Sequence, residues 1–518
     1  MIASGAPGGG RGSIVIPFER LMSLARPPAS TEVWSIPEFS ERFRTHRRFD
    51  LMTDAERQAI HEAALEVLEN PGIRVHSPTA RRALKAAGAE VHERTHDVRF
   101  PPGLVASLLR TAPREVVLAG RTEEFDLPFN GTHIYVTTDA CGIAVWDEAT
   151  RSRRKPVLDD VRKTAVLTDA LPYLSLYTPM VVASDVPERA HVVEGVRTAM
   201  ENTRKHIESE STSNAAEARA EVEMAAAVVG SPEELLDRHY LSAVTCTVSP
   251  LILDEAATEA AMVFADHHVP IHCMSMAHAG ISAPVTLAGD VVVNHAETLA
   301  LMCAAQARAP GAPVMYGSCL SQMDPRTGAY QGGSAESLLL CAATVEMAKH
   351  IRVPISAGGF GSSAKIPGIQ ASVEGALSAM IQGLVGAELV NGIGEADGST
   401  VLSYEQFMID YDTFGMALRM SQGIDVTPET LAVDLIRKVG IGGSYLAQMH
   451  TVRHMREIFL PLLWDTNPYE DWVQKGKKDP MVLARERAEG LLAGHTPVPL
   501  DARTSEHLAA ISKDFLKR

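Results

Sequence analysis

The chain has 518 residues and a formal net charge of −16 at pH 7, with 46% hydrophobic and 22% charged residues. These values are typical of a soluble globular protein, and the acidic excess argues against a nucleic-acid-binding surface, which is usually basic. No apolar run approaches the roughly 20 residues of a membrane span, and the run at residues 14–17 is too short for a signal peptide. The six cysteines form no CxxC pair, so we expect reduced thiols in a cytoplasmic protein without nucleic-acid or membrane contacts.

The first 130 residues predict a surface arm followed by a small cap region. Residues 1–50 are rich in Gly, Pro and Arg and show little period, which is typical of an irregular arm. Residues 54–70 carry apolar side chains at helical spacing and stop at a Pro-Gly pair. Together with short elements at 73–76, 79–87 and 102–111, this helix predicts an N-terminal α/β cap over residues 51–130.

From about residue 132 onward, eight apolar, β-rich runs alternate with helical stretches. An alternation of this kind predicts parallel strands joined by right-handed crossovers, and a count of eight favours a closed (β/α)8 TIM barrel over residues 131–425. The alternative is an open doubly wound sheet, which is disfavoured because no GxGxxG follows the first strand. The expected strands are 134–138, 174–181, 206–211, 241–248, 270–276, 313–319, 353–358 and 388–394, and the expected helices are 158–170, 188–202, 215–229, 254–267, 291–308, 336–350, 369–385 and 403–420.

A C-terminal helical extension is expected over residues 426–518. Its predicted helices are 428–439 and 445–463, followed by a patch around Trp472 and Lys475 and a final amphipathic helix. We expect this extension to pack against the outside of the barrel or to join the subunits of a homo-oligomer.

Function in such a barrel gathers at the carboxyl ends of the strands, where the loops converge. The residues there combine aromatic rings and carboxylates without concentrated positive charge, which suits a bulky cation such as a quaternary ammonium. The alternative for each ring is that it only fills the barrel core. The residues at these positions are Asp139, Tyr177, Glu210, Thr247, Ser249, Met274, Ser275, Tyr316, Ser318, Phe360, Glu395 and Asp397.

Two Gly-rich loops at 357–363 and 391–399 support a competing interpretation, a phosphate site built from backbone amides. Glu395 and Asp397 would repel a phosphate, however, and the carboxylate of a betaine could bind the same amides. A barrel enzyme acting on a phosphorylated metabolite is therefore kept as an alternative function.

Cys273 and Cys319 are candidate ligands of a thiolate metal site, and His272 lies beside the first of them. Zinc would require three or four ligands in a tetrahedral array, and no third thiolate or histidine stands at a suitable position. We therefore predict no metal site.

Several segments closely resemble the trimethylamine methyltransferase family. The likeness extends from about residue 52 to the C-terminus and implies a (β/α)8 barrel that passes a methyl group from an amine to the Co(I) of a corrinoid protein. The resemblance implies that this protein partner supplies the corrinoid and that the chain itself holds no tightly bound cofactor. The segments are HEAALEVLENPGIRVHS (61–77), RFPPGLVASLLRTAP (99–113), SPL (249–251), GISAPVTLAG (280–289), AE (296–297), PGAPVMYG (310–317), the segment around Gln370 and Glu374, GIGGSYLAQMHT (440–451) and WxxxG (472–476).

Founding members of this family carry pyrrolysine at the barrel mouth, whereas this chain contains only standard residues. It therefore resembles the non-pyrrolysine branch, which includes glycine betaine methyltransferase. It departs from the family pattern at Gly368, where an Asp is common two positions before Gln370. A quaternary ammonium leaves as a neutral amine and needs no proton, so the resemblance implies glycine betaine or a similar methylated amine as substrate in one-carbon metabolism.

The expected roles follow from this substrate. Glu210 and Glu395 are the predicted catalytic residues, which balance the charge of the nitrogen. The substrate-binding set comprises the rings that face the ammonium head, the groups that hold its carboxylate and two further polar residues: Tyr177, Tyr316, Phe360, Gly358, Ser362, Gln370, Asp397 and His450. Gln370 could instead cap its helix, and His450 could pack between helices. A relative that binds a betaine without turnover remains a further alternative.

Overall fold

The computed structural model describes residues 44, 49–140 and 142–517, so most of the expected arm at 1–50 lies outside the described residues. Eight parallel strands form one sheet in the order β6-β19-β18-β15-β13-β11-β10-β9. The two edge strands approach each other, because the amide of Ser175 donates to the carbonyl of Val136 at 3.0 Å. The sheet is thus a nearly closed barrel, as predicted. Its strands are β6 (Tyr135–Val136), β9 (Leu176–Tyr177), β10 (His206–Ser209), β11 (Leu241–Cys246), β13 (Ile271–Ser275), β15 (Val314–Ser318), β18 (Ile355–Ala357) and β19 (Leu389–Val390).

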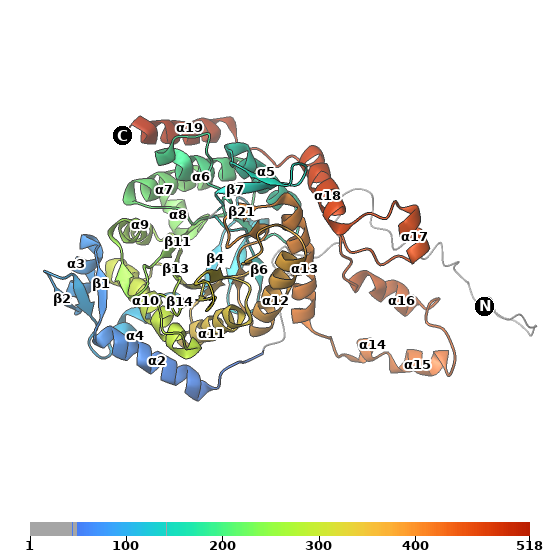
Figure 1. The fold of residues 1–518 in the computed structure, drawn as a ribbon, viewed down its shortest axis with the longest axis horizontal. Coiled ribbons are helices and arrows are strands. Elements are labelled where there is room, and N and C mark those ends of the chain that lie inside the picture. The colour runs from blue at the N-terminus through green and yellow to red at the C-terminus, as the bar shows by residue number, and fades with distance from the viewer. Residues whose placement is uncertain (1–43, 45–48, 141, 518) are drawn as a thin grey trace, which may run out of the picture. The chain divides into compact units, whose positions relative to one another are not determined.

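Helices surround this barrel (Figure 1), and each of the eight predicted strand–helix pairs is present. The helix after β10 shows why the ends are readable from sequence: Asn214 caps its first turn by accepting from Ala216 and Glu217, and Gly230 follows its last residue. The helices are α5 (Leu158–Ala170), α6 (His191–Asn202), α7 (Ala215–Val229), α9 (Glu255–Asp266), α10 (Leu287–Arg308), α11 (Ala335–Ile351), α12 (Ile369–Val385) and α13 (Tyr404–Gln422).

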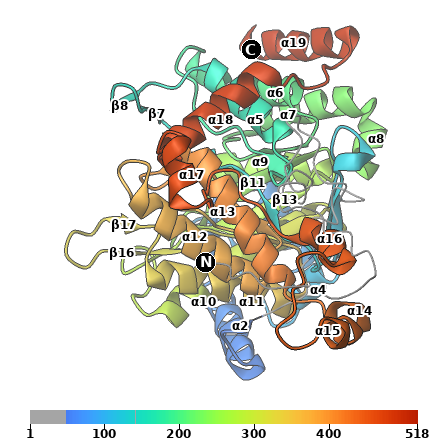
Figure 2. The ribbon, with the colours of Figure 1, turned by 90° about the vertical axis from the view of Figure 1, so that its right-hand side faces the viewer.

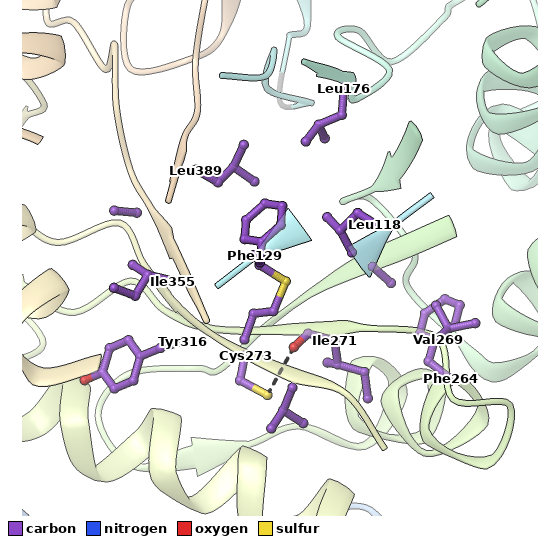
Figure 3. Close-up of a cluster of buried hydrophobic side chains, with 14 of the residues drawn as sticks. Leu118, Phe129, Leu176, Phe264, Val269, Ile271, Cys273, Tyr316, Ile355 and Leu389 are labelled. Atoms are coloured by element: carbon purple, nitrogen blue, oxygen red, sulfur yellow. Dashed lines mark hydrogen bonds between the residues drawn. The ribbon is translucent and has the colours of Figure 1, made fainter. Parts of the chain in front are cut away.

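The amino ends of the barrel strands are closed by a hairpin, β4 (Val116–Leu118) and β5 (Leu127–Phe129). The amide of Ala119 donates to the carbonyl of His239, just before β11 begins, which places the hairpin at that end. Leu118 and Phe129 are fully buried, and Phe129 lies among Leu118, Leu176 and Leu389 in the middle of the cluster (Figure 3). Packed apolar side chains therefore fill this end.

The carboxyl ends of the strands carry short strands that the sequence did not reveal. One small sheet joins β7 (Ala144–Asp147), β8 (Ser152–Arg154), β20 (Glu395–Ala396) and β21 (Val401–Leu402), and another joins β14 (His278–Ala279), β16 (Ser321–Met323) and β17 (Tyr330–Gln331). The hairpins β7–β8 and β16–β17 project from the same side of the barrel (Figure 2). Strands of two to four residues are too short to show a period-two pattern, so the sequence predicted only loops here.

The predicted cap elements are present, together with an additional strand pair. They are α2 (Asp54–Glu69), β1 (Ile73–Val75), α3 (Pro78–Ala87), β2 (Glu90–His92), β3 (Asp97–Arg99) and α4 (Leu104–Leu109). Strand β1 pairs in parallel with β12 (Ile252–Leu253), which follows barrel strand β11. Helices α2, α3 and α4 pack against α10. The cap is therefore attached to the barrel unit through its strand β1 and through its helices.

Residues 424–460 form a separate compact unit with α14 (Pro428–Leu431), α15 (Val433–Val439), α16 (Met449–His454) and the 3-10 turn η4 (Met455–Glu457). The predicted helix 428–439 is interrupted at Ala432, which has a φ of 50°. The predicted helix 445–463 is wrong over most of its length, because Pro461 cannot continue a helix and the Ser444 hydroxyl accepts from the amide of Leu446.

The rest of the tail belongs with the barrel unit. It contains α17 (Tyr469–Gln474), α18 (Pro480–Gly494), which packs against α13, and α19 (Ala502–Lys517), which packs against α6 and α7. Among the described residues, no helix is both long enough and apolar enough to traverse a bilayer.

Candidate functional site

A cavity of about 190 Å³ opens at the carboxyl ends of the barrel strands. Its lining residues stand where strands end and loops begin, which is where a barrel positions its reactive groups. One residue from each of six different strand ends contributes to the wall: Asp139, Glu210, Met274, Cys319, Gly358 and Asn391.

Three carboxyl groups gather at this cavity. Asp139 and Glu210 line it, and Glu395 on β20 lies close enough for the charge of Asp139 to act on it. Glu395 is only 2% exposed; it interacts with Ser399 and Asp139, but among the described residues neither of its carboxyl oxygens is in good hydrogen-bond geometry. The same holds for Oε2 of Glu210, whose carboxyl group interacts with Asp139. Buried carboxylates of this kind are costly unless they hold a proton or meet a cation.

The pKa values of these carboxyl groups point to the same need for a proton or a nearby cation. Burial raises the pKa of Glu210 well above its ordinary value, and the negative charge of Asp139 raises it further. The pKa of Glu395 is raised by burial and again by Asp139. A positive ligand would relieve both effects at once, because an opposite charge nearby favours the ionised carboxylate.

An aromatic ring completes the cavity wall. Tyr330 lies on β17, and a Cβ atom placed on Gly398 would stand only 3.1 Å from its ring. The ring of His278 lies 5.4 Å from that of Tyr330, centroid to centroid, and burial lowers the pKa of His278, so that ring is neutral. Burial likewise raises the pKa of Tyr330. An aromatic face beside carboxylates attracts an organic cation.

Among the described residues, none that lines the cavity is Lys or Arg. The soft side chains of Met274, Met276 and Cys319 also line it. The described wall is therefore acidic, aromatic and sulfur-rich. This composition argues against a phosphate ligand.

The two tyrosines predicted to face the ligand point the other way. The Tyr177 hydroxyl donates to the carbonyl of Val161 on α5 at 2.9 Å. The Tyr316 hydroxyl lies 2.9 Å from Nδ1 of His295 on α10, and its ring points away from the barrel centre (Figure 3). Alternate residues of a strand point to opposite faces, so both rings lie on the helix side, and neither is among the residues that line the cavity.

Phe360 is also turned toward the helices. It is 1% exposed, and a Cβ atom on Gly375 of α12 would stand 2.8 Å from its Cδ1 atom. Phe360, like the two tyrosines, is therefore not among the residues that line the cavity.

The Gly-rich loop after β18 offers no anion cradle of the expected kind. Gly358 does line the cavity, but its amide donates to the carbonyl of Ser318 at 2.6 Å. The amide of Phe360 donates to Asn391 at 2.8 Å, and that of Gly361 to Gly359 at 2.6 Å. Three of the five amides expected to hold a carboxylate are thus already used within the fold, and a phosphate would lack the same donors.

Ser362 and Gln370 serve the loop rather than the cavity. Both donate to Glu374 on α12, the hydroxyl of Ser362 at 2.6 Å and the side-chain amide of Gln370 at 2.9 Å. In this arrangement the polar groups of both side chains bind Glu374, and neither is directed at a substrate carboxylate. A helix-capping role for Gln370 was the alternative, and its bond to Glu374 instead lies within α12.

Asp397 ties loops together beside the cavity, where the next residue, Gly398, contributes to the wall. It pairs with Lys365 and, at 2.9 Å, with Arg153 on β8. Partial burial would raise the pKa of Asp397, but its bonds and charges with Lys365 and Arg153 outweigh this and hold the pKa below its ordinary value. Asp397 is thus a structural anion whose charge is already balanced.

His450 lies on α16 in the separate unit 424–460, where its ring faces that of His454 at 4.3 Å between centroids. Its predicted approach to the barrel mouth stays a prediction.

The two cysteines considered as metal ligands do not lie at the same site. Cys273 is fully buried in the core, with its thiol 3.8 Å from the carbonyl of Ile271, whereas Cys319 lines the cavity. Among the described residues, no three His, Cys, Asp or Glu side chains are grouped as a metal ion would require.

Sequence reasoning missed Tyr330, His278 and Asn391. Tyr330 follows the turn at Asp324–Gly328, and such a Pro- and Gly-containing turn between short polar strands is the signal that a hairpin search could have used. No signal of this kind identifies Asn391.

Comparisons with known proteins relate this sequence to one family. The sequence matches the family described as Trimethylamine methyltransferase (MTTB) over residues 26–518. It is similar to trimethylamine methyltransferase MttB of Methanosarcina barkeri, with 34% identity over 467 residues that cover 89% of this chain and 94% of that protein. Glycine betaine methyltransferase of Desulfitobacterium hafniense is 30% identical over 466 residues, which cover 89% of this chain and 96% of that protein.

A solved structure is similar at greater distance. The crystal structure of the monomethylamine methyltransferase of Methanosarcina barkeri has 13% sequence identity and a TM-score of 0.48, with 92% of this chain and 93% of that chain covered. The family match spans nearly the entire sequence. The chain therefore belongs to the trimethylamine methyltransferase family.

Proposed function

We propose that this methyltransferase takes its methyl group from a quaternary amine, a permanently charged member of the methylated amines, and passes it to the cobalt of a corrinoid protein. Membership of the family supports the enzyme class and the corrinoid partner. The observation that carries the choice of substrate is a cavity whose described lining residues include two carboxyl groups and a tyrosine ring but no Lys or Arg, with a third carboxyl group, Glu395, close to Asp139.

Charge balance favours a cation in this cavity. Among the described residues, the oxygens of Glu395 and Oε2 of Glu210 are not in good hydrogen-bond geometry, so an empty cavity holds these carboxyl groups at a cost. A trimethylammonium head would supply the missing positive charge and lay its methyl groups against the face of Tyr330. Neutral or anionic ligands gain nothing from the same groups.

The chemistry of the leaving group favours a quaternary nitrogen. A quaternary ammonium that loses a methyl group departs as a neutral tertiary amine, with no proton required. An ammonium that carries an N–H would share its proton with one of the nearby carboxylates, which leaves more electron density on nitrogen and makes it a poorer methyl donor. The carboxyl cluster is therefore better matched to a nitrogen that has no proton to share.

The methyl acceptor is the cobalt that the partner protein carries, and it supplies the nucleophile. This chain contributes alignment and the exclusion of water, because its cavity holds the donor nitrogen beside fixed charges. Asp139, Glu210 and Glu395 are the proposed groups that balance the charge on the nitrogen, and Tyr330 takes the place expected of Tyr316 and Phe360. Glycine betaine, expected from the sequence, belongs to this class of substrate.

The proposal is tested by incubating the enzyme with reduced corrinoid protein and a panel of quaternary and tertiary amines, while the absorbance of the methylated corrinoid is followed. A parallel titration compares choline with its neutral analogue, in which carbon replaces the nitrogen. We expect transfer from at least one quaternary amine and choline binding at least about tenfold tighter than the analogue. Equal binding of the two ligands would refute the proposal, and tight binding without any methyl transfer would instead favour a non-catalytic relative.

A further inference from the structure

We infer that the preferred substrate carries no carboxylate beside its charged nitrogen, so that the site selects a monocationic quaternary ammonium, such as choline, over glycine betaine. The inference rests on the proposed function and names the substrate class for the same cavity. It follows from the signs of the charges that line the cavity and from the donors that the loops leave free.

The cavity is so small that both ends of a betaine would lie close to the same charged side chains. In glycine betaine a single carbon separates the nitrogen from the carboxylate, so both groups must enter the same space of about 190 Å³. A head group that contacts Asp139 and Glu210, the two carboxyl groups that line the cavity, places the carboxylate of the substrate within a few ångströms of like charge. Asp139 is the residue whose negative charge already acts on both Glu210 and Glu395.

The described wall offers a substrate carboxylate no charged partner. None of the described lining residues is Lys or Arg, and the amides of Gly358 and Gly361 donate to carbonyls of the chain itself. Lys365, in the loop after β18, and Arg153, on β8, are both paired with Asp397, the residue beside the lining residue Gly398. A substrate carboxylate that reached Lys365 or Arg153 would have to compete with Asp397, which is already paired with both cations.

A protonated Glu210 or Glu395 could donate one hydrogen bond to a carboxylate in the empty cavity, since the pKa of each is raised. The arriving ammonium head opposes this, because a cation nearby lowers the pKa of both groups and favours their charged forms. The carboxyl groups that bind the head thus become charges that repel the other end of the betaine. A hydroxyl group in that position, as in choline, meets no repulsion and can donate to a carboxylate.

The test is isothermal titration of the full-length enzyme with choline, tetramethylammonium and glycine betaine at neutral pH and low salt. We expect choline and tetramethylammonium to bind at least about tenfold tighter than glycine betaine, which corresponds to about 1.4 kcal/mol. Binding of glycine betaine as tight as or tighter than that of choline overturns the inference and leaves the proposed function standing. Failure of all three cations to bind overturns both.

A variant separates charge repulsion from shape. Asp139→Asn removes the negative charge common to the cluster, so we expect weaker choline binding and a smaller ratio between choline and glycine betaine. The matched control is Asp266→Asn, which removes a carboxylate on the outer surface paired with Arg308 at 2.7 Å and should leave the ratio unchanged. An unchanged ratio in Asp139→Asn would overturn the electrostatic origin of the selectivity. Circular dichroism checks that each variant folds, and the comparison of ligands on the wild-type enzyme stands as a test without either variant.

Discussion

Glu208 Oε2 lies 2.9 Å from Nδ1 of His272 in the interior of the barrel, and both side chains are fully buried. The hydroxyl of Thr178 donates to the other oxygen of Glu208 at 3.2 Å and lies 3.0 Å from that of Thr137. Thr137, Glu208 and His272 stand two strand positions before the cavity residues Asp139, Glu210 and Met274. The side chains of the ligand cavity thus stand on a layer of buried polar residues.

The first prediction concerns that layer. Glu208→Ala removes the partner of a buried histidine and leaves a void, so we expect the free energy of unfolding to fall by about 3 kcal/mol. Urea unfolding followed by circular dichroism measures the change. The surface control Glu93→Ala, whose partner Lys85 is largely exposed, should change the free energy by less than about 1 kcal/mol. Equal effects of the two substitutions would contradict the importance of the layer.

A second prediction tests which aromatic ring meets the ligand. Tyr330→Leu removes the ring from the cavity wall, so we expect the affinity for choline to fall about tenfold, whereas Tyr330→Phe keeps the ring and most of the affinity. The control Tyr316→Phe loses hydrogen bonds to Asn294 and His295 on the helix side. It should lower stability by about 1 to 2 kcal/mol and leave choline affinity unchanged. A loss of affinity in Tyr316→Phe would show that the ring assignment is mistaken.

The third prediction is a steric one at the Gly-rich loop. A Cβ atom on Gly359 would stand 2.2 Å from the carbonyl oxygen of Asn391, whereas one on Gly361 meets nothing closer than 3.7 Å. Gly359→Ala must therefore displace Asn391 in the cavity wall, and we expect weaker choline binding and a loss of stability of about 1 to 3 kcal/mol. Gly361→Ala is the matched control and should retain both. Titration calorimetry measures choline binding by the two variants, and urea unfolding measures their stability.

The fourth prediction is a loss of stability as pH rises from about 6.5 to 8 in the enzyme without ligand. Burial raises the pKa of Glu221 to about 8 and that of Asp410 to about 7. Between the ordinary carboxyl pKa and these values the folded state binds more protons than the unfolded state, so stability falls as pH rises toward 8. Burial lowers the pKa of His239 to about 4, so its contribution to stability falls as pH drops below the ordinary histidine value of about 6.5.

Urea midpoints measured from pH 5 to pH 9 should therefore fall most steeply between about pH 6.5 and pH 8, because below about 6.5 the contribution of His239 offsets part of that of the carboxyl groups. Glu221→Gln should make this fall smaller, because the amide keeps the hydrogen bond with Thr212 and cannot ionise. A midpoint that rises steadily up to pH 9 in the wild-type protein would contradict this account.

Much of the architecture could be predicted because local signals and tertiary structure agree. The eight β-rich runs and the helices between them are all present, and α5, α7 and α12 begin and end where the periodicity places them. Caps such as Asn214 and terminal glycines such as Gly230 act within a few residues of the chain. The short strands of the two small sheets were missed, and the helix expected at 445–463 was wrong over most of its length, because neither the hydrogen bonds nor the ends of these segments depend on local pattern alone.

The amino-acid sequence by itself determined the barrel, the family and the acidic character of the strand ends that carry Asp139, Glu210 and Glu395. Only the tertiary structure decided which side chains enter the cavity. Every residue of β13 and β15 is buried, because a parallel strand inside a helical shell has apolar surroundings on both faces. Such a strand shows no polar alternation, so its sequence does not reveal that Tyr316 faces a helix while its neighbours face the barrel interior, and a ring from a distant hairpin, Tyr330, takes the place beside the carboxylates.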